Sequence, residues 1–165
     1  MLIYKKLEKR GTSMKKSEFK AKKIVGIEIR TRNADNQAEK DMTVLWGTFI
    51  NDNIMEKIPN KTNLDVYCIY TNYESDFTGE YSVILGCEVT SLPEKLPNNM
   101  IYKEIPDMKG LVFEACGKIP ESIVKTWNEI WSTPLDRAYI ADIEKYKLSD
   151  FQDENAAVEV FISMR

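Results

Sequence analysis

Histidine is absent from all 165 residues of the sequence. Histidine is the general base of Ser-His-Asp and Cys-His catalytic pairs, and it is a usual ligand of zinc. Its absence therefore excludes those nucleophilic mechanisms and the usual zinc sites. Any catalysis would have to use carboxylates, tyrosines or lysines. Because the sequence also lacks a glycine-rich nucleotide-binding motif, we expect neither a metal nor another cofactor.

Cysteine is scarce, and its spacing follows no metal-binding or disulfide pattern. Cys68, Cys87 and Cys116 lie far apart in apolar, strand-like segments without Cys-x-x-Cys spacing. This pattern predicts buried, reduced thiols in a cytosolic protein. Long apolar runs are also lacking, since no segment approaches the roughly 20 residues that span a bilayer. The N-terminus has no apolar core of signal-peptide length, so we predict a cytoplasmic protein that does not enter a membrane.

The net charge of −3 conceals an uneven distribution of charged residues. Residues 1–24 contain nine basic and two acidic residues, whereas the remaining 141 contain 14 basic and 24 acidic residues. An acidic body lacks the basic face that phosphates require, so we expect no direct DNA binding. We interpret residues 1–18 as a basic extension, with disorder left open, and residues 19–165 as one domain. Met14 is an alternative start, which would leave residues 1–13 outside the fold.

Hydrophobic periodicity predicts the same order of elements twice along the chain. The first half has a strand, a helix and two further strands, at 22–33, 35–58, 65–74 and 79–90. The second half has a strand region broken at Pro106–Gly110, a helix bounded by prolines and two closing strands, at 100–117, 119–134, 137–148 and 156–165. A proline-containing linker at 91–99 separates the two halves.

Two repeated halves, at about 19–91 and 100–165, predict an α+β fold. Each half is a strand-helix-strand-strand module, so the fold should contain a mainly antiparallel sheet covered by two main helices. Pairing of the halves about a pseudo-twofold axis would leave a central cleft between them. Interfaces between like modules are preferred places for ligand pockets.

The segment "RAYIADIEKY" (137–146) carries two carboxylates on one side of a predicted strand. Asp142 and Glu144 are two residues apart, so their side chains point the same way, together with Ile140 and Tyr146. Either this side meets water, or one carboxylate lines an apolar hollow. From the residues alone, the solvated alternative is favoured for Glu144, because glutamate is seldom buried. Asp142 is expected to be exposed or hydrogen-bonded to a turn.

Aromatic side chains recur on the predicted helices and on the strand at 65–74, the first strand of the predicted hairpin. Taken singly, each is expected to pack in the core, because the apolar stripe of a helix normally faces the sheet. Tyr70 lies in the middle of its strand. The helix aromatics with spacing suited to a shared apolar side are Trp46, Phe49, Trp127 and Trp131.

Several segments in the same order give the chain a family resemblance over about residues 19–165. They are "IVGIEIRT", "LWGTFI", "IYTNYESDFTGEYSVILGCEV", "GLVFEACGKIPESIVKTWNEIW" and "RAYIADIEKY". The sequence resembles the GyrI-like family, also called the AraC-type or bacterial-activator effector-binding domain. It is most similar to the branch of that family that has no attached helix-turn-helix.

The resemblance implies a duplicated fold whose central cleft binds hydrophobic, often cationic, small molecules between aromatic side chains. It places an acidic residue at the base of the cleft, and the matching position is Glu144. The family commonly has an aromatic residue before this glutamate, where this chain has Ile143. The ligand-binding residues expected in the cleft are Glu144, Tyr70, Trp46, Phe49, Trp127 and Trp131.

Three functions remain open on this resemblance. The preferred one is a stand-alone effector-binding protein that senses or sequesters a hydrophobic cation and can present the loaded state to a protein partner. The first alternative is a carboxylate-dependent hydrolase of reactive small molecules, in which Glu144 would be the catalytic residue. The second alternative is an inhibitory module that acts through protein–protein interaction.

Overall fold

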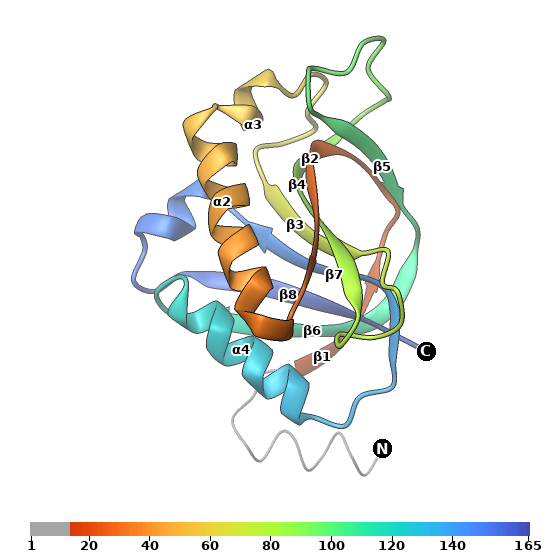
Figure 1. The fold of residues 1–165 in the computed structure, drawn as a ribbon, viewed down its shortest axis with the longest axis vertical. Coiled ribbons are helices and arrows are strands. Elements are labelled where there is room, and N and C mark those ends of the chain that lie inside the picture. The colour runs from red at the N-terminus through yellow and green to blue at the C-terminus, as the bar shows by residue number, and fades with distance from the viewer. Residues whose placement is uncertain (1–13) are drawn as a thin grey trace.

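A computed structural model describes residues 14–165, and its elements follow the predicted order (Figure 1). The strands are β1 (Met14–Phe19), β2 (Lys22–Arg32), β3 (Val66–Thr71), β4 (Glu80–Val89), β5 (Ile101–Ile105), β6 (Met108–Cys116), β7 (Arg137–Tyr146) and β8 (Ala157–Met164). The helices are α2 (Gln37–Asn51), α3 (Ile54–Lys57) and α4 (Glu121–Ser132), with short 3-10 segments η1 (Ala34–Asn36) and η2 (Leu148–Gln152). The predicted α+β class and the two main helices are confirmed.

The sheet itself displays the predicted duplication. Its strand order is β1-β6-β8-β7-β3-β4-β2-β5, and every neighbouring pair is antiparallel. The module β2-α2-β3-β4 therefore mirrors β6-α4-β7-β8, and β3 and β7 meet at the centre. Each edge strand pairs with the other half, since β1 lies beside β6 and β5 lies beside β2. This exchange ties the two modules into one sheet.

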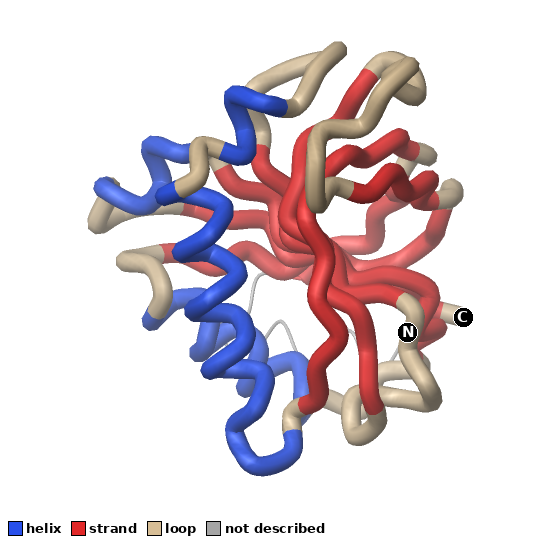
Figure 2. Tube along the Cα trace, turned by 45° about the horizontal axis from the view of Figure 1, so that its top comes forward, coloured by secondary structure: helices blue, strands red, loops and turns tan. Residues whose placement is uncertain are grey.

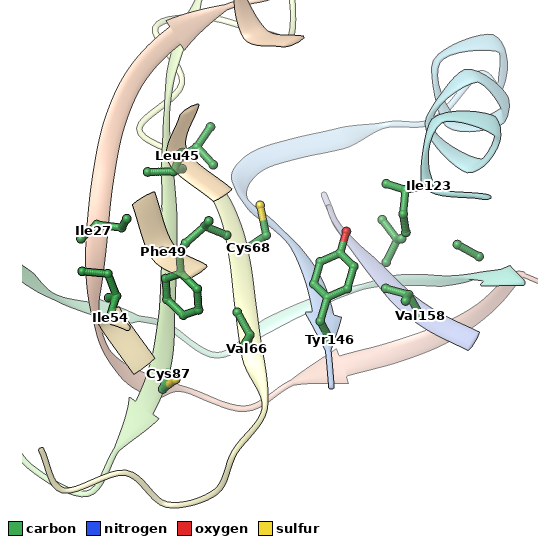
Figure 3. Close-up of a cluster of buried hydrophobic side chains, with 14 of the residues drawn as sticks. Ile27, Leu45, Phe49, Ile54, Val66, Cys68, Cys87, Ile123, Tyr146 and Val158 are labelled. Carbon is green, nitrogen blue, oxygen red and sulfur yellow. The ribbon is translucent and has the colours of Figure 1, made fainter. Parts of the chain in front are cut away.

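The helices lie on one side of the sheet, whereas the other face closes on itself (Figure 2). Beneath the helices, a buried cluster joins α2 residues such as Leu45 and Phe49 to strand residues and to Ile123 of α4 (Figure 3). A second buried cluster contains residues from all eight strands, including Phe19 of β1 and Phe161 of β8. Because both faces are covered, residues of β3 and β4 are buried almost without interruption rather than alternating between buried and exposed.

Three boundaries differ from the sequence-based expectation. Residues 14–18, placed in the basic extension, belong to β1, because their backbone groups pair with β6. The single helix expected over 35–58 is interrupted between α2 and α3, where Asn53 adopts a left-handed conformation with φ 51° that asparagine tolerates. The strand break near Pro106 is shorter than predicted, since β6 already begins at Met108. The remainder of the predicted extension, 1–13, lies outside the described residues.

The cysteine prediction is confirmed for two residues and is wrong for the third. Cys68 and Cys87 are buried free thiols, but Cys116 is exposed because it ends β6 at the edge of the packed region. Burial raises the pKa of Cys87 to about 11. Over residues 14–165, no helix is both long enough and apolar enough to cross a bilayer.

Candidate functional site

A cavity of about 830 Å³ lies between the two main helices and the centre of the sheet. Its volume falls within the range of roughly 300–1,000 Å³ that is typical of small-molecule pockets. Both halves of the chain contribute to it, so it occupies the predicted junction of the two modules. Aromatic and aliphatic side chains of the helices, the central strands and η2 form most of its wall: Met42, Trp46, Ile50, Tyr70, Tyr81, Ile123, Trp127, Trp131, Tyr146 and Phe151.

Glu144 borders this cavity from the centre of the sheet. It lies on β7 opposite Cys68 of β3, and only 1% of it is exposed to solvent. Three side chains donate hydrogen bonds to its carboxylate. The Tyr70 hydroxyl (2.7 Å) and the Trp127 indole N–H (2.8 Å) donate to Oε2, and the Tyr146 hydroxyl (2.5 Å) donates to Oε1. The donors come from β3, α4 and β7, so both halves hold the carboxylate in place.

The charge of Glu144 has no cationic partner within residues 14–165. Each of its three hydrogen-bond donors is a neutral group, and none of the ion pairs there includes it. Burial raises the pKa of the Glu144 carboxyl, and the bonds from Tyr146, Tyr70 and Trp127 partly oppose that rise. An anion at this position is therefore oriented by donors but lacks charge compensation.

Asp142, two residues earlier, has the opposite environment. It is fully buried, and its carboxylate accepts hydrogen bonds from Arg137 Nη2 (2.7 Å), the Tyr73 hydroxyl (2.6 Å) and the Ser163 backbone N–H (3.1 Å). Burial raises the pKa of the Asp142 carboxyl, whereas the adjacent guanidinium of Arg137 opposes that rise. The two charges of this pair cancel, so Glu144 remains as the unbalanced charge at the cavity floor.

The expectation that Asp142 would be exposed is wrong, whereas the alternative of a bond to a turn is met in part by Tyr73 of the connection between β3 and β4. The burial of Asp142 has a cause in the backbone. The pairing of β7 with β8 shifts between Arg137 and Asp142, and within this irregularity Tyr139 adopts a φ of 54°. Such bulges redirect side chains relative to a regular strand. Arg137 and Asp142 thereby contact one another, although simple alternation over five residues would place them on opposite faces.

The structure brings five of the six predicted ligand-binding residues to the cavity. Trp46, Tyr70, Trp127, Trp131 and Glu144 border it. The Trp127 ring packs at a steep angle on Tyr70 (centroids 5.3 Å apart) and lies 5.9 Å from Trp131, which is 45% exposed at the mouth.

Phe49 is the predicted residue that does not reach the cavity. It is 2% exposed and packs in the core beneath α2, where its ring centroid lies 6.1 Å from that of Trp46. Three positions along a helix separate the two rings by about 60° around its axis. Trp46 therefore turns toward the cavity, whereas Phe49 turns toward the sheet and Ile54.

Several residues of the cavity wall were not predicted from the sequence, and four of them bear on its chemistry. Tyr146 could have been predicted, because it shares a strand side with Glu144 in the sequence. In the structure its hydroxyl donates to Glu144, and its ring stacks on Phe151 with centroids 5.4 Å apart. Tyr81 borders the cavity from β4, and Arg137 borders it from the start of β7. Phe151 lies in η2, where no hydrophobic period marks its direction. The residues described contain no group of three or more side chains suited to hold a metal ion.

Comparison with known proteins assigns the chain to a family. The family model that describes integron-associated effector-binding proteins matches residues 17–164. An integron cassette protein from the mobile metagenome of Vibrio cholerae is 34% identical, with 92% of this chain and 95% of that chain covered and a TM-score of 0.70. None of the curated proteins that were searched matches the chain.

Two further solved structures share the fold at low identity. One is a putative bacterial transcription regulation protein from Staphylococcus aureus, 15% identical, with coverage of 94% and 99% and a TM-score of 0.73. The other is SAV2435 bound to tetraphenylphosphonium, 16% identical, with coverage of 93% and 94% and a TM-score of 0.77. The family match and the shared fold confirm the resemblance drawn from the sequence. The chain belongs to the integron-associated effector-binding proteins.

Proposed function

We propose that this effector-binding protein binds hydrophobic organic cations in its central cavity and that Glu144 supplies the attracting charge. The observation that carries the proposal is the carboxylate itself: it is 1% exposed, it is held by three neutral donors, and no ion pair among the described residues balances it. A buried and unbalanced anion is costly to the free protein. A cation that enters the cavity would remove this cost.

The magnitudes favour a cation over a neutral molecule of the same shape. Two opposite charges roughly 5 Å apart attract by about 3 kcal/mol at an effective dielectric constant near 20. Each well-placed aromatic ring adds about 0.5–2 kcal/mol of cation–π attraction. Flat rings such as Trp46 and Trp127 accept many ligand outlines, so recognition should be broad. The binding of tetraphenylphosphonium, a hydrophobic cation, by a protein with the same fold supports this ligand class.

A binding role receives more support from the site than the hydrolase alternative. A general base needs a carboxylate oxygen free to take a proton from water. Here neutral donors already occupy three of the roughly four acceptor sites of the Glu144 carboxylate, which leaves a single site for a water molecule. We therefore propose a sensor or sequestering protein, with a protein partner as the route by which ligand binding would be signalled.

A titration with tetraphenylphosphonium tests the proposal. All three tryptophans of the chain border the cavity, so entry of the ligand should change their fluorescence. We expect binding at micromolar levels by the wild type and a roughly hundredfold loss of affinity in Glu144→Gln, from the charge term alone. Glu39→Gln is the matched control, because Glu39 borders the same cavity from an exposed position and should change affinity less than about twofold. Equal affinity of wild type and Glu144→Gln would overturn the proposal.

A further inference from the structure

Arg137 places a buried cationic group on the wall of the same cavity. It begins β7, borders the cavity and is only 6% exposed. Within residues 14–165, Nη2 makes the only hydrogen bond of its guanidinium, to Asp142, and the buried Nε has no partner. Nη1 likewise donates to no acceptor among the described residues. A guanidinium has five N–H donors, so most of its donor capacity is unused.

The guanidinium is held in one position rather than free to turn toward water. Its ion pair with Asp142 fixes one edge at 2.7 Å. The ring of Tyr139 lies 4.4 Å from the guanidinium carbon and that of Trp127 lies 5.9 Å away, both within cation–π range. A donor that is fixed, poorly hydrated and unsatisfied binds an acceptor with little loss of conformational freedom.

The charges around Arg137 decide which kind of acceptor fits. Asp142 already neutralises the guanidinium, and Glu144 already makes the floor of the cavity negative. A ligand carboxylate would therefore bring a second negative charge to a pair that needs none. A carbonyl oxygen can accept from Nη1, the unpaired nitrogen that is not fully buried, without adding charge, and bonds to charged donors are stronger than neutral ones.

We propose that the cavity selects cations that also carry a neutral oxygen acceptor, with the cationic centre at Glu144 and the acceptor at Arg137. This inference rests on the proposed function, since it adds a second contact to the same cavity. Trp127 fixes the spacing of the two contacts, because its indole N–H donates to Glu144 while its ring lies beside Arg137. The favoured ligands therefore carry a ketone, ester or amide whose distance from the cationic centre is about the length of the Trp127 indole ring system.

Three probes that differ in a single substituent test the selection. They are phenyltrimethylammonium ions that carry an acetyl, an isopropyl or a carboxylate group on the ring, each as the meta and the para isomer. Acetyl and isopropyl have nearly the same shape, but acetyl alone presents an oxygen acceptor. We expect the better acetyl isomer to bind roughly three- to tenfold more tightly than its isopropyl counterpart, although it is less apolar. The carboxylate probe should bind more weakly than acetyl.

Two variants assign the preference to its residues. In Arg137→Met with Asp142→Asn, both charges are removed together, because either change alone would leave a buried unpaired charge. In this double variant, the affinity for the acetyl probe divided by the affinity for the isopropyl probe should fall to one or below. In Glu144→Gln, both probes should lose affinity by the same factor, so the preference should remain.

The outcomes separate the two claims, that Glu144 attracts the cation and that Arg137 binds the oxygen acceptor. Tight binding that depends on Glu144 but shows no acetyl preference in the wild type would overturn the role of Arg137 and leave the cation site standing. An acetyl preference that persists in the double variant would also overturn it. Failure of every probe to bind, or binding that ignores Glu144→Gln, would overturn the proposed function and this inference with it. The wild-type comparison does not depend on whether the double variant folds.

Discussion

Replacing Glu144 by glutamine should stabilise the protein at the same time as it weakens cation binding. Oε2 of Glu144 accepts two hydrogen bonds, from Tyr70 and Trp127, and the glutamine carbonyl can take over both. Oε1 accepts from the Tyr146 hydroxyl, whose oxygen can instead accept from the new amide N–H. The substitution therefore keeps the shape of the site and the number of its hydrogen bonds, reverses the bond to Tyr146, whose hydroxyl proton can turn to the cavity that Tyr146 borders, and removes the charge.

The size of the effect follows from the same contacts. A buried ion costs several kcal/mol after relaxation. Three hydrogen bonds to a charged group exceed three neutral ones by about 3 kcal/mol in total. The difference leaves a gain of about 1–2 kcal/mol for Glu144→Gln, which for a domain of this length raises Tm by roughly 2–8 °C.

The pH dependence gives this prediction its sharpest test. Because burial raises the pKa of Glu144 in the folded protein, the wild type loses stability as pH rises from the unfolded pKa through the folded one. The glutamine variant lacks this loss. Thermal unfolding followed by circular dichroism should therefore show similar Tm values near pH 4 and a more stable variant at pH 8. A variant that is less stable than the wild type at pH 8 would refute the reasoning.

Further substitutions and labelling separate the core from the cavity. Phe49→Ala should lower the free energy of unfolding by about 3–5 kcal/mol, measured by urea unfolding, because Phe49 is buried in the core. Titration should show unchanged ligand affinity, and weaker binding would show that Phe49 contributes to the cavity after all. Trp131→Ala, at a 45% exposed ring, should show the reverse pattern of unchanged stability and weaker tetraphenylphosphonium binding. A thiol reagent should modify Cys116 in the native protein, whereas Cys68 and Cys87 should react only after unfolding; prompt reaction at three thiols would contradict the burial.

The order of elements was predictable because it depends on local pattern. Apolar spacing placed α2, α4 and the strands of both modules near their observed bounds, and the repeat predicted the cavity between the halves. The edge strand β1 was not predictable from pattern in this way, whereas the other edge strand, β5, lies within the strand region predicted at 100–117. β1 is a strand because β6 supplies its hydrogen-bond partners, and its sequence "MKKSEF" has no marked alternation.

The site was predictable only in part. Family resemblance reversed the residue-based expectation for Glu144, since composition alone favours a solvated glutamate, whereas the structure buries it. Phe49 and Trp46 both follow an apolar helical stripe, and only the position of the sheet decides which ring turns inward. The pair of Arg137 with Asp142 could not be read from strand alternation, because it depends on the irregular backbone at Tyr139.

The charge of Glu144 can be followed directly by carbon-13 NMR of glutamate side chains, with the Glu144 signal assigned by its loss in Glu144→Gln. A pH titration of the free protein should give a pKa above the ordinary value of about 4.3, because burial disfavours the anion. The same titration with saturating tetraphenylphosphonium should give a lower pKa than in the free protein, because a nearby cation stabilises the carboxylate. An unchanged or higher pKa in the complex would contradict the account.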